Sequence, residues 1–210
     1  LISSLIALKK DNLKARLAFS TIGQLSYIVL GIAILSPLST AGALYHLVAH
    51  AFMKITLFMC AGAIFVTTHK KDISEMVGLG RRMPVTMSAF TIASLGIAGF
   101  PFFVGFVSKA NIIMGALKTG QLLFGATLIV SAVLALTYLM PVVLITFKRE
   151  PVNPEFNTYG EASKTMLVPL LITATVSVIL GVAPNFGLHL LDLAMSTGEA
   201  VFAHVGGVIC

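Results

Sequence analysis

Two histidines and a lysine follow one another at four-residue intervals inside a long apolar segment. His46, His50 and Lys54 lie within Ala41–Thr68, where Lys54 is the only fully charged side chain. On a helix, residues four apart drift by only about 40° and rise about 6 Å, so these three side chains share one face. Two imidazoles and an amine stacked over about 12 Å can hand protons along that face. The spacing therefore predicts a proton relay.

The depth of Lys54 supports a functional interpretation. A bilayer requires roughly 20 apolar residues for a crossing, and a lysine near the middle of a span costs at least about 2.5 kcal/mol. The alternative is a polar patch that packs helices together, but serine or threonine would do so at lower cost. His46 and His50 also have the spacing of two zinc ligands, but zinc needs a third protein ligand and none is near in sequence. We therefore expect no metal and no cofactor.

A second lysine follows a segment interrupted by glycine and proline. Residues Phe103–Leu117 are too few to cross as an ideal helix, and Gly99 and Pro101 precede them. Irregular backbone at membrane depth is tolerated only where protein or water covers it, and such interrupted segments are the best sequence indication of a transporter's site. Lys109, beside Ser108, lies just past the break and is predicted to carry protons. A lysine that extends to the membrane interface is the alternative.

Polar residues also form a stripe on the first predicted helix, Leu17–Leu35. Ser20, Gln24 and Tyr27 are spaced so that they share one of its faces. That face could hold water beside the histidines, or it could pack helices together. The same two interpretations apply to three polar residues further along the chain: Ser131, Thr137 and Tyr138.

The composition is that of an integral membrane protein. Of the 210 residues, 57% are hydrophobic and 10% are charged, with a mean hydropathy of +0.98, whereas soluble domains carry about 25% charged residues. The acidic residues lie in polar loops or near the end of the chain. The net charge of +6 comes largely from short loops, without a basic face interleaved with aromatics, so nucleic acid is excluded as a partner. Cys60 and Cys210 indicate no disulfide framework.

Apolar runs between polar breaks predict an all-α membrane bundle of about six transmembrane helices, one of them broken. The runs are Leu17–Leu35, Ala41–Thr68, Pro84–Phe100, Phe103–Leu117, Gln121–Phe147 and Thr165–Ala183. The basic loops Lys9–Arg16 and His69–Arg82 are separated by two crossings, so they share a side. Their excess of lysine and arginine predicts that this side is cytoplasmic. Residues Lys148–Lys164 are balanced in charge and are expected to connect two helices.

The chain divides into two expected parts. Residues 1–184 are predicted to form a transmembrane proton-translocation domain, and residues 185–210 a further membrane or interfacial helix that is truncated. There is no initiator Met, and the apolar residues Leu1–Leu8 are too short for a span and lack the basic start and cleavage site of a signal peptide. We therefore expect a fragment that begins inside a helix.

Four motifs occur in order between about residues 8 and 147. They are Asp11–Thr21 followed by Gln24–Tyr27, then His46–Lys54, then Gly78–Pro84, and finally Gly99–Lys109. In this order they resemble the antiporter-like subunits of respiratory complex I and of Mrp-type cation/proton antiporters. The resemblance implies the C-terminal half of that core, which contains the second of two inverted five-helix repeats.

The resemblance also implies a role for each buried or basic residue. Lys14 corresponds to a lysine that links two half-channels, and Lys109 to the terminal lysine on a broken helix. His46, His50 and Lys54 correspond to the central relay. The family's Glu–Lys pair belongs to the first half, which is absent here, and this agrees with the lack of a mid-span acid in the sequence.

Two positions depart from the family pattern. Many relatives carry an acid directly after the broken-helix lysine, where this chain has Ala110-Asn111, and many have Pro-Pro or Pro-Leu where it has Pro101-Phe102. Neither departure removes a proton carrier. The pattern as a whole is most similar to the D-type members of the Mrp branch.

Together these features predict a proton-translocating subunit of a multi-subunit monovalent cation/proton antiporter. Its partners would be other membrane subunits, lipid, protons and Na+ or K+, and the Mrp resemblance implies a prokaryotic plasma (inner) membrane. One alternative is an antiporter-like pumping subunit of an NADH dehydrogenase or membrane-bound hydrogenase. Another is a non-conducting structural subunit, whose polar faces would not need to converge on one core. No nucleophile–base constellation is present, so we expect no catalytic site in the chain itself.

Overall fold

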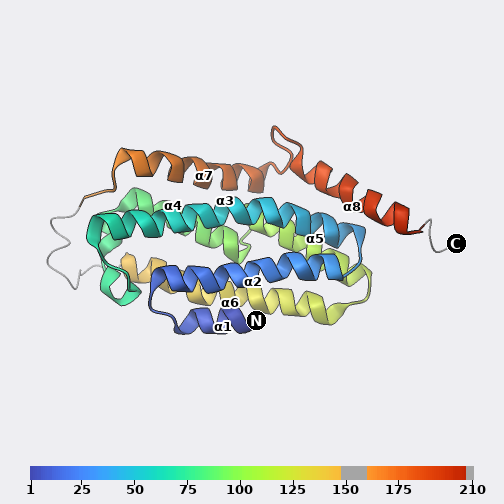
Figure 1. Ribbon diagram of the computed structural model, residues 1–210, viewed down its shortest axis with the longest axis horizontal. Helices are drawn as coiled ribbons and strands as arrows, with labels where there is room; N and C mark the ends of the chain where they lie inside the picture. The colour runs from blue at the N-terminus through green and yellow to red at the C-terminus, as the bar shows by residue number, and fades with distance from the viewer. Residues whose placement is uncertain (148–159, 207–210) are drawn as a thin grey trace.

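Helices that lie roughly side by side make up the protein (Figure 1). The computed structural model describes residues 1–147 and 160–206, and within these ranges there is no strand, only an isolated bridge between Asn12 and Asp72. The helices are α1 (Ile2–Lys9), α2 (Leu13–Ala33), α3 (Pro37–Thr68), α4 (Pro84–Ala98), α5 (Val104–Lys118), α6 (Leu122–Thr146), α7 (Lys164–Val182) and α8 (Leu190–Gly206), with short 3-10 turns η1 (Ile73–Met76) and η2 (Leu79–Arg81). The predicted all-α membrane bundle is confirmed, and each of the six predicted runs corresponds to one helix.

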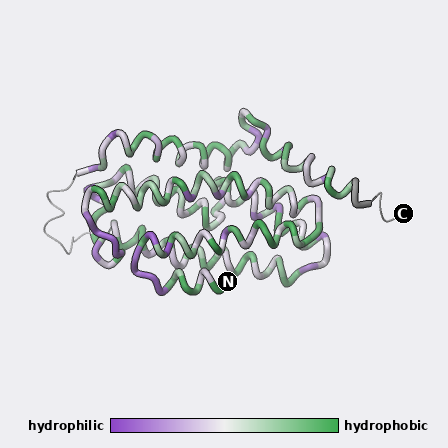
Figure 2. Tube along the Cα trace, in the orientation of Figure 1, coloured by the Kyte–Doolittle hydropathy of each residue, from purple (hydrophilic) through white to green (hydrophobic). Residues whose placement is uncertain are grey.

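Length and apolar character divide the helices into two groups. By these criteria α2, α3, α6 and α7 can cross a membrane, whereas α4 and α5 have only 15 residues each. Figure 2 shows hydrophobic residues along the helices and hydrophilic residues mainly in the loops, as expected where helix surfaces meet lipid or one another. Most of the predicted connector Lys148–Lys164, and Cys210, lie outside the described residues.

The longest helix, α3, is the centre of the bundle. It has 32 residues, begins with Pro37 in its first turn, where a missing N–H costs nothing, and ends at Thr68, which is followed by His69 with a left-handed φ of 56°. It packs against α2, α4, α5, α7 and α8. At Gly42 the neighbouring helix α5 comes so close that an added Cβ would lie 2.8 Å from the Ile112 nitrogen. Small residues on α3 therefore allow the close approach that places polar side chains in the core.

The two short helices run end to end along α3. Thr86 of α4 accepts a hydrogen bond from Cys60 near one end of α3, whereas Ile112 of α5 lies against Gly42 near the other end. Residue numbers thus rise along α4 and α5 as they fall along α3. The pair forms the broken helix that the sequence predicts.

Glycine and proline make the break between α4 and α5. Gly99 ends α4 with a φ of 85°, a left-handed conformation that strains other residues. Phe102 follows with a φ of 72°, beyond Pro101. The chain then turns back so closely that a Cβ at Gly105 would collide with the carbonyl of Gly96. The predicted break at Gly99–Gly105 is confirmed.

The two basic loops lie together at one end of the bundle. Asn12 bridges Asp72 in an antiparallel backbone pair, and the Ser74 hydroxyl donates to the Asp11 carboxylate over 2.6 Å. The loops Lys9–Arg16 and His69–Arg82 therefore adjoin each other, while the side of the membrane on which they lie stays a prediction.

One boundary at this end was predicted wrongly. The side chain of Asn12 accepts the Ala15 N–H over 3.1 Å and caps α2, so the helix begins at Leu13 instead of Leu17. Lys14 and Arg16 are therefore helical and not part of a loop.

The last two helices cover one side of α3. Helix α7 packs on α3, α4 and α5, and α8 packs on α3, with a Cβ at Gly198 of α8 lying 2.5 Å from the carbonyl oxygen of Pro37. Figure 1 shows α8 continuing beyond α7 towards the far end of the bundle. A helix is thus present where a truncated tail segment was predicted, and the proposed division at residue 184 stays a prediction.

Candidate functional site

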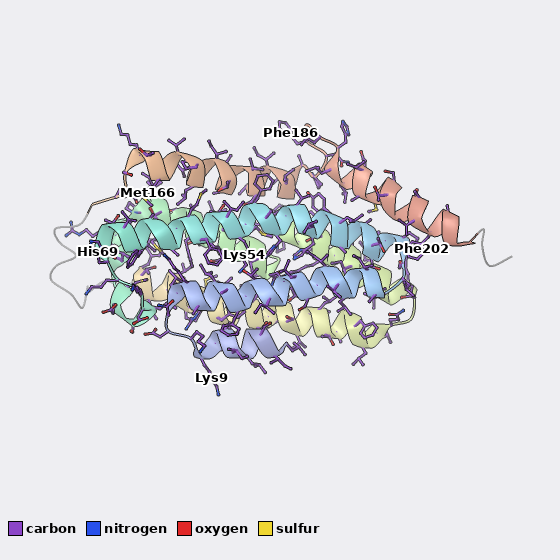
Figure 3. All side chains as sticks on the ribbon, viewed as in Figure 1. Lys9, Lys54, His69, Met166, Phe186 and Phe202 are labelled. Carbon is purple, nitrogen blue, oxygen red and sulfur yellow. The ribbon has the colours of Figure 1, made fainter. Side chains whose placement is uncertain are left out.

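Lys54 lies near the centre of the bundle, on the side of α3 that faces α2 (Figure 3). Only 5% of the residue is exposed. Its Nζ donates to Ser20 Oγ over 2.7 Å and to the Leu17 carbonyl over 3.2 Å. Among residues 1–147 and 160–206 it forms no ion pair. The amine is therefore held by neutral oxygens only, a setting in which no fixed counter-charge locks it in the protonated form.

His46 and His50 continue the face that Lys54 begins. Their ring centroids are 6.2 Å apart and the rings are nearly parallel, at 29°. His46 is fully buried and His50 is 7% exposed. The four-residue spacing thus produces the stack that the sequence predicts.

A serine on α5 favours one tautomer of His46. Ser108 Oγ lies 2.7 Å from His46 Nδ1 and donates to the Gly105 carbonyl over 3.0 Å. A hydroxyl has one proton, so Ser108 accepts from Nδ1–H and leaves Nε2 as the acceptor nitrogen. In the described part of the chain, Nε2 of His46 and Nε2 of His50 have no hydrogen-bond partner. Both histidines thus present a nitrogen that can exchange a proton.

The helix break creates the binding position of Lys109. In an unbroken helix, the Ile97 carbonyl would accept the N–H of residue 101, but that residue is Pro101 and has no N–H. The Lys109 Nζ donates to this carbonyl instead, over 2.5 Å. Lys109 is only 5% exposed, so the alternative of a lysine extended to the interface is not what the structure shows.

Tyr27 of α2 contacts site residues on two other helices, α3 and α5. Its ring lies edge-on to His46 with centroids 5.8 Å apart, and its centroid is 4.9 Å from Lys109 Nζ. Polar faces of α2, α3 and α5 therefore converge on one buried core. This convergence favours a relay over a structural patch, and the transfer of protons itself stays a prediction.

Lys14 is not brought to this core. It is exposed at the end of the bundle, with its Nζ 5.0 Å from the centroid of the Phe65 ring. Phe65 lies about 16 Å beyond Lys54 along α3 at 1.5 Å per residue. Thr137 is also exposed and bonds only to the Leu134 carbonyl of its own helix.

Arg16, which the sequence placed in a loop, and Tyr138, for which the sequence left water contact or helix packing open, both lie within the site. The Tyr138 hydroxyl is 2.7 Å from Ser20 Oγ, and the Arg16 guanidinium donates to the Tyr138 carbonyl over 3.0 Å. Tyr138 and Ser131 are buried seven residues apart on α6, a spacing that places them on one face. That spacing is the signal in the sequence that could have indicated their involvement.

The fold is that of an all-helical membrane protein in which buried lysines and histidines lie beside a broken helix. Residues 1–137 match the family described as "NADH:quinone oxidoreductase/Mrp antiporter, TM". The chain belongs to this family, and the predicted resemblance to antiporter-like subunits is confirmed.

The chain is similar in sequence to known members and in fold to a solved structure. The chain is 35% identical over 192 residues to NADH-quinone oxidoreductase subunit N of Desulforudis audaxviator, covering 86% of this chain and 38% of the relative. It is 39% identical over 186 residues to subunit L of Mycobacterium tuberculosis, covering 86% of this chain and 29% of the relative. The Mrp complex from Dietzia has the same fold, with a TM-score of 0.86, 24% identity and coverage of 100% of this chain and 47% of that chain.

The comparisons also concern the length of the chain and its branch within the family. The chain spans less than half the length of each of these relatives. The matches include both the complex I and the Mrp branches, so the preference for the D-type members of the Mrp branch stays a prediction.

Proposed function

We propose that the chain is the proton-translocating part of an antiporter-like subunit and moves protons among Lys54, His50, His46 and Lys109. The observation that carries this proposal is the burial of two amines, Lys54 and Lys109, whose polar contacts are neutral groups and whose surroundings meet at Tyr27. A structural patch would not require two such amines, because hydroxyl groups pack helices at lower cost.

The geometry supports an order of transfer. Lys54 and the two histidines lie along one face of α3, and His46 shares Tyr27 with Lys109. Water can bridge a step where the cavity is polar and large enough to hold it. A charge on one lysine raises the energy of a charge on the other, so arrival of a proton at one amine favours release from its neighbour. Lys14, near the basic loops, would join this path to the preceding part of the subunit.

Two kinds of complex are candidates for the assembly that contains this subunit. The sequence pattern favours a monovalent cation/proton antiporter that exchanges protons for Na+ or K+ in a prokaryotic plasma membrane, with Lys9–Arg16 and His69–Arg82 on the cytoplasmic side. The relatives named as NADH-quinone oxidoreductase subunits support the second candidate, a pump driven by a redox module. Small antiporter genes beside the complete gene would favour the first, and genes for redox subunits the second. Either complex would supply other membrane subunits as partners.

Lys109 provides the experiment that tests proton translocation. Lys109→Ala removes the amine from the Ile97 carbonyl and should reduce proton flux in vesicles that hold the complete complex, with assembly preserved. Lys109→Arg should also impair flux, because guanidinium does not deprotonate. Lys118→Ala is the matched control, since Lys118 is exposed at the end of the same helix, and it should leave flux unchanged. Equal losses of assembled protein and of flux in Lys109→Ala would support the structural alternative.

A further inference from the structure

Between α2 and α6 the structure holds a series of hydroxyl and amide groups beside the histidines. We propose that this series is a second proton path from Lys54 to Lys109, which rests on the function proposed above and bypasses both histidines. We name it the hydroxyl path. It consists of five residues on two facing helix surfaces: Ser20, Gln24, Tyr27, Ser131 and Tyr138.

The path begins with two short hydrogen bonds, and the direction of the first is fixed. Lys54 in its charged form can only donate, so Ser20 Oγ accepts from it over 2.7 Å. The proton of Ser20 is then available to Tyr138, whose hydroxyl oxygen lies 2.7 Å away. Both distances are typical of strong hydrogen bonds. The proton of Tyr138 in turn is left for a further acceptor.

Gln24 lies at the position of that acceptor. It is one helical turn beyond Ser20 and 2% exposed, and its side chain adjoins the hydroxyls of Tyr138 and Tyr27. In the described part of the chain, its Oε1 and the Tyr27 hydroxyl have no hydrogen-bond partner. A buried carbonyl and a buried hydroxyl side by side favour a bridging water. Such a water would carry the proton from Tyr138 to Tyr27, with Gln24 holding it in place.

The far end of the path lies beside Lys109. The Tyr27 hydroxyl adjoins Ser131 of α6, and the Tyr27 ring centroid is 4.9 Å from Lys109 Nζ. From Ser20 to Tyr27 the path rises about 10 Å along α2, and from Lys54 to His46 the histidine series rises about 12 Å along α3. The two series therefore have nearly the same length and the same two ends.

Each transfer along the hydroxyl path conserves protons. Lys54 gives one N–H proton to Ser20, Ser20 gives its own to Tyr138, and Tyr138 gives its own through the bridging water to Tyr27. Because the Lys109 amine lies over the Tyr27 ring and not at its hydroxyl, Tyr27 would give its own proton through a second water to the lone pair of neutral Lys109. Every hydroxyl thus regains the proton that it loses, and only N–H and O–H bonds break and form. Rotation of the hydroxyls then restores the starting orientation.

The contacts of Ser20 differ from those of hydroxyls that form hydrogen bonds only within their own helix. Elsewhere in these helices Thr21, Ser26 and Thr127 donate to carbonyls four residues earlier in their own helix. Ser20 instead bonds across helices to an amine and a tyrosine. The carbonyl of Tyr138 is in turn held by Arg16, which fixes the turn of α6 that carries the hydroxyl.

The experiment measures proton flux in vesicles that hold the complete complex, normalised to assembled protein. Tyr138→Phe alone should reduce flux only modestly, and His46→Ala/His50→Ala should leave flux that the hydroxyl path carries. The variant that carries all three substitutions should have a relative flux at least about tenfold below the product of the relative fluxes of the other two variants. The reason is that each of two parallel routes compensates for the loss of the other. Ser20→Ala in place of Tyr138→Phe should give the same result. If the relative flux of the triple variant equals the product of the other two relative fluxes, the second path is wrong.

Two further variants separate transfer from packing. Tyr45→Phe also removes a buried hydroxyl, one that donates to the Leu180 carbonyl over 2.7 Å outside the path, so it should not add to the loss in the double-histidine variant. Replacement of Tyr138 by 3-fluorotyrosine retains size and hydroxyl but changes proton affinity. It should shift the pH profile of flux in the double-histidine variant, and an unchanged profile would contradict a transfer role.

Failure of the second path differs from failure of the proposed function. If Lys54→Met stops flux while Tyr138→Phe and the histidine substitutions act independently, only the hydroxyl path is wrong. If Lys54→Met transports normally, both proposals are wrong, because both paths begin at Lys54.

Discussion

Gly99 sets the position of the Lys109 amine, and its replacement gives a sharp prediction. Gly99 has a φ of 85°, and a Cβ there would lie 3.0 Å from Lys109 Cδ and 3.6 Å from Nζ. Gly99→Ala should therefore push the lysine away from the Ile97 carbonyl. The substitution tests the importance of this geometry while the amine itself is retained.

The size of the effect has two parts. Alanine in a left-handed conformation costs about 1–2 kcal/mol, which acts on stability. Loss of a hydrogen bond from a charged donor costs about 1.5–3 kcal/mol, which acts on the position of Lys109. The second part corresponds to an occupancy of the bound position that is about 10- to 150-fold lower. We expect proton flux per assembled complex to fall by a factor in this range.

Gly120→Ala is the matched control. Gly120 also has a positive φ, 74°, but no atom lies within 4 Å of an added Cβ. Thermal unfolding should show similar destabilisation of the two variants, while vesicle flux should fall only in Gly99→Ala. Equal flux in both variants would refute the conclusion that the contact with Gly99 positions the amine.

Three further predictions concern Ser108, Gly105 and the two basic loops. Ser108→Ala should lower the free energy of unfolding by about 1–3 kcal/mol, because it leaves His46 Nδ1 unpaired. Nitrogen NMR of labelled His46 should then show loss of the single Nδ1–H tautomer, and an unchanged spectrum would contradict the assignment of that tautomer. Gly105→Ala should prevent assembly, measured by native gel, because a Cβ there collides with the last turn of α4, and normal assembly would argue against the close turn. Cysteines placed in Lys9–Arg16 and His69–Arg82 should be labelled from the cytoplasmic face only. Labelling of either loop from the outer face would contradict the predicted orientation.

Much of the histidine–lysine core could be predicted from the sequence. The spacing of His46, His50 and Lys54 determines a common helix face, whatever that face packs against. The broken helix was also predictable, because glycine and proline act through local backbone geometry. The acceptor of Lys109 follows from the same rule, since Pro101 leaves the Ile97 carbonyl without its helical partner.

The contacts across helices were not predictable in this way. Ser20 and Tyr138 are 118 positions apart, and their meeting depends on how α2 and α6 rotate and pack. Periodicity shows that Ser131 and Tyr138 share a face but not which helix that face meets. The late predicted start of α2 has a local cause, because hydropathy alone does not register the cap that Asn12 provides.

Proton flux through Lys54→Met tests the central claim most directly. Methionine retains much of the side-chain length but cannot titrate, and removal of a mid-membrane amine should not hinder insertion. Lys71→Met is the control, because Lys71 is exposed at the end of the bundle. In vesicles that hold equal amounts of assembled complex, we predict background flux for Lys54→Met and normal flux for Lys71→Met. Near-normal flux in Lys54→Met would contradict the relay and favour a structural role for the buried lysines.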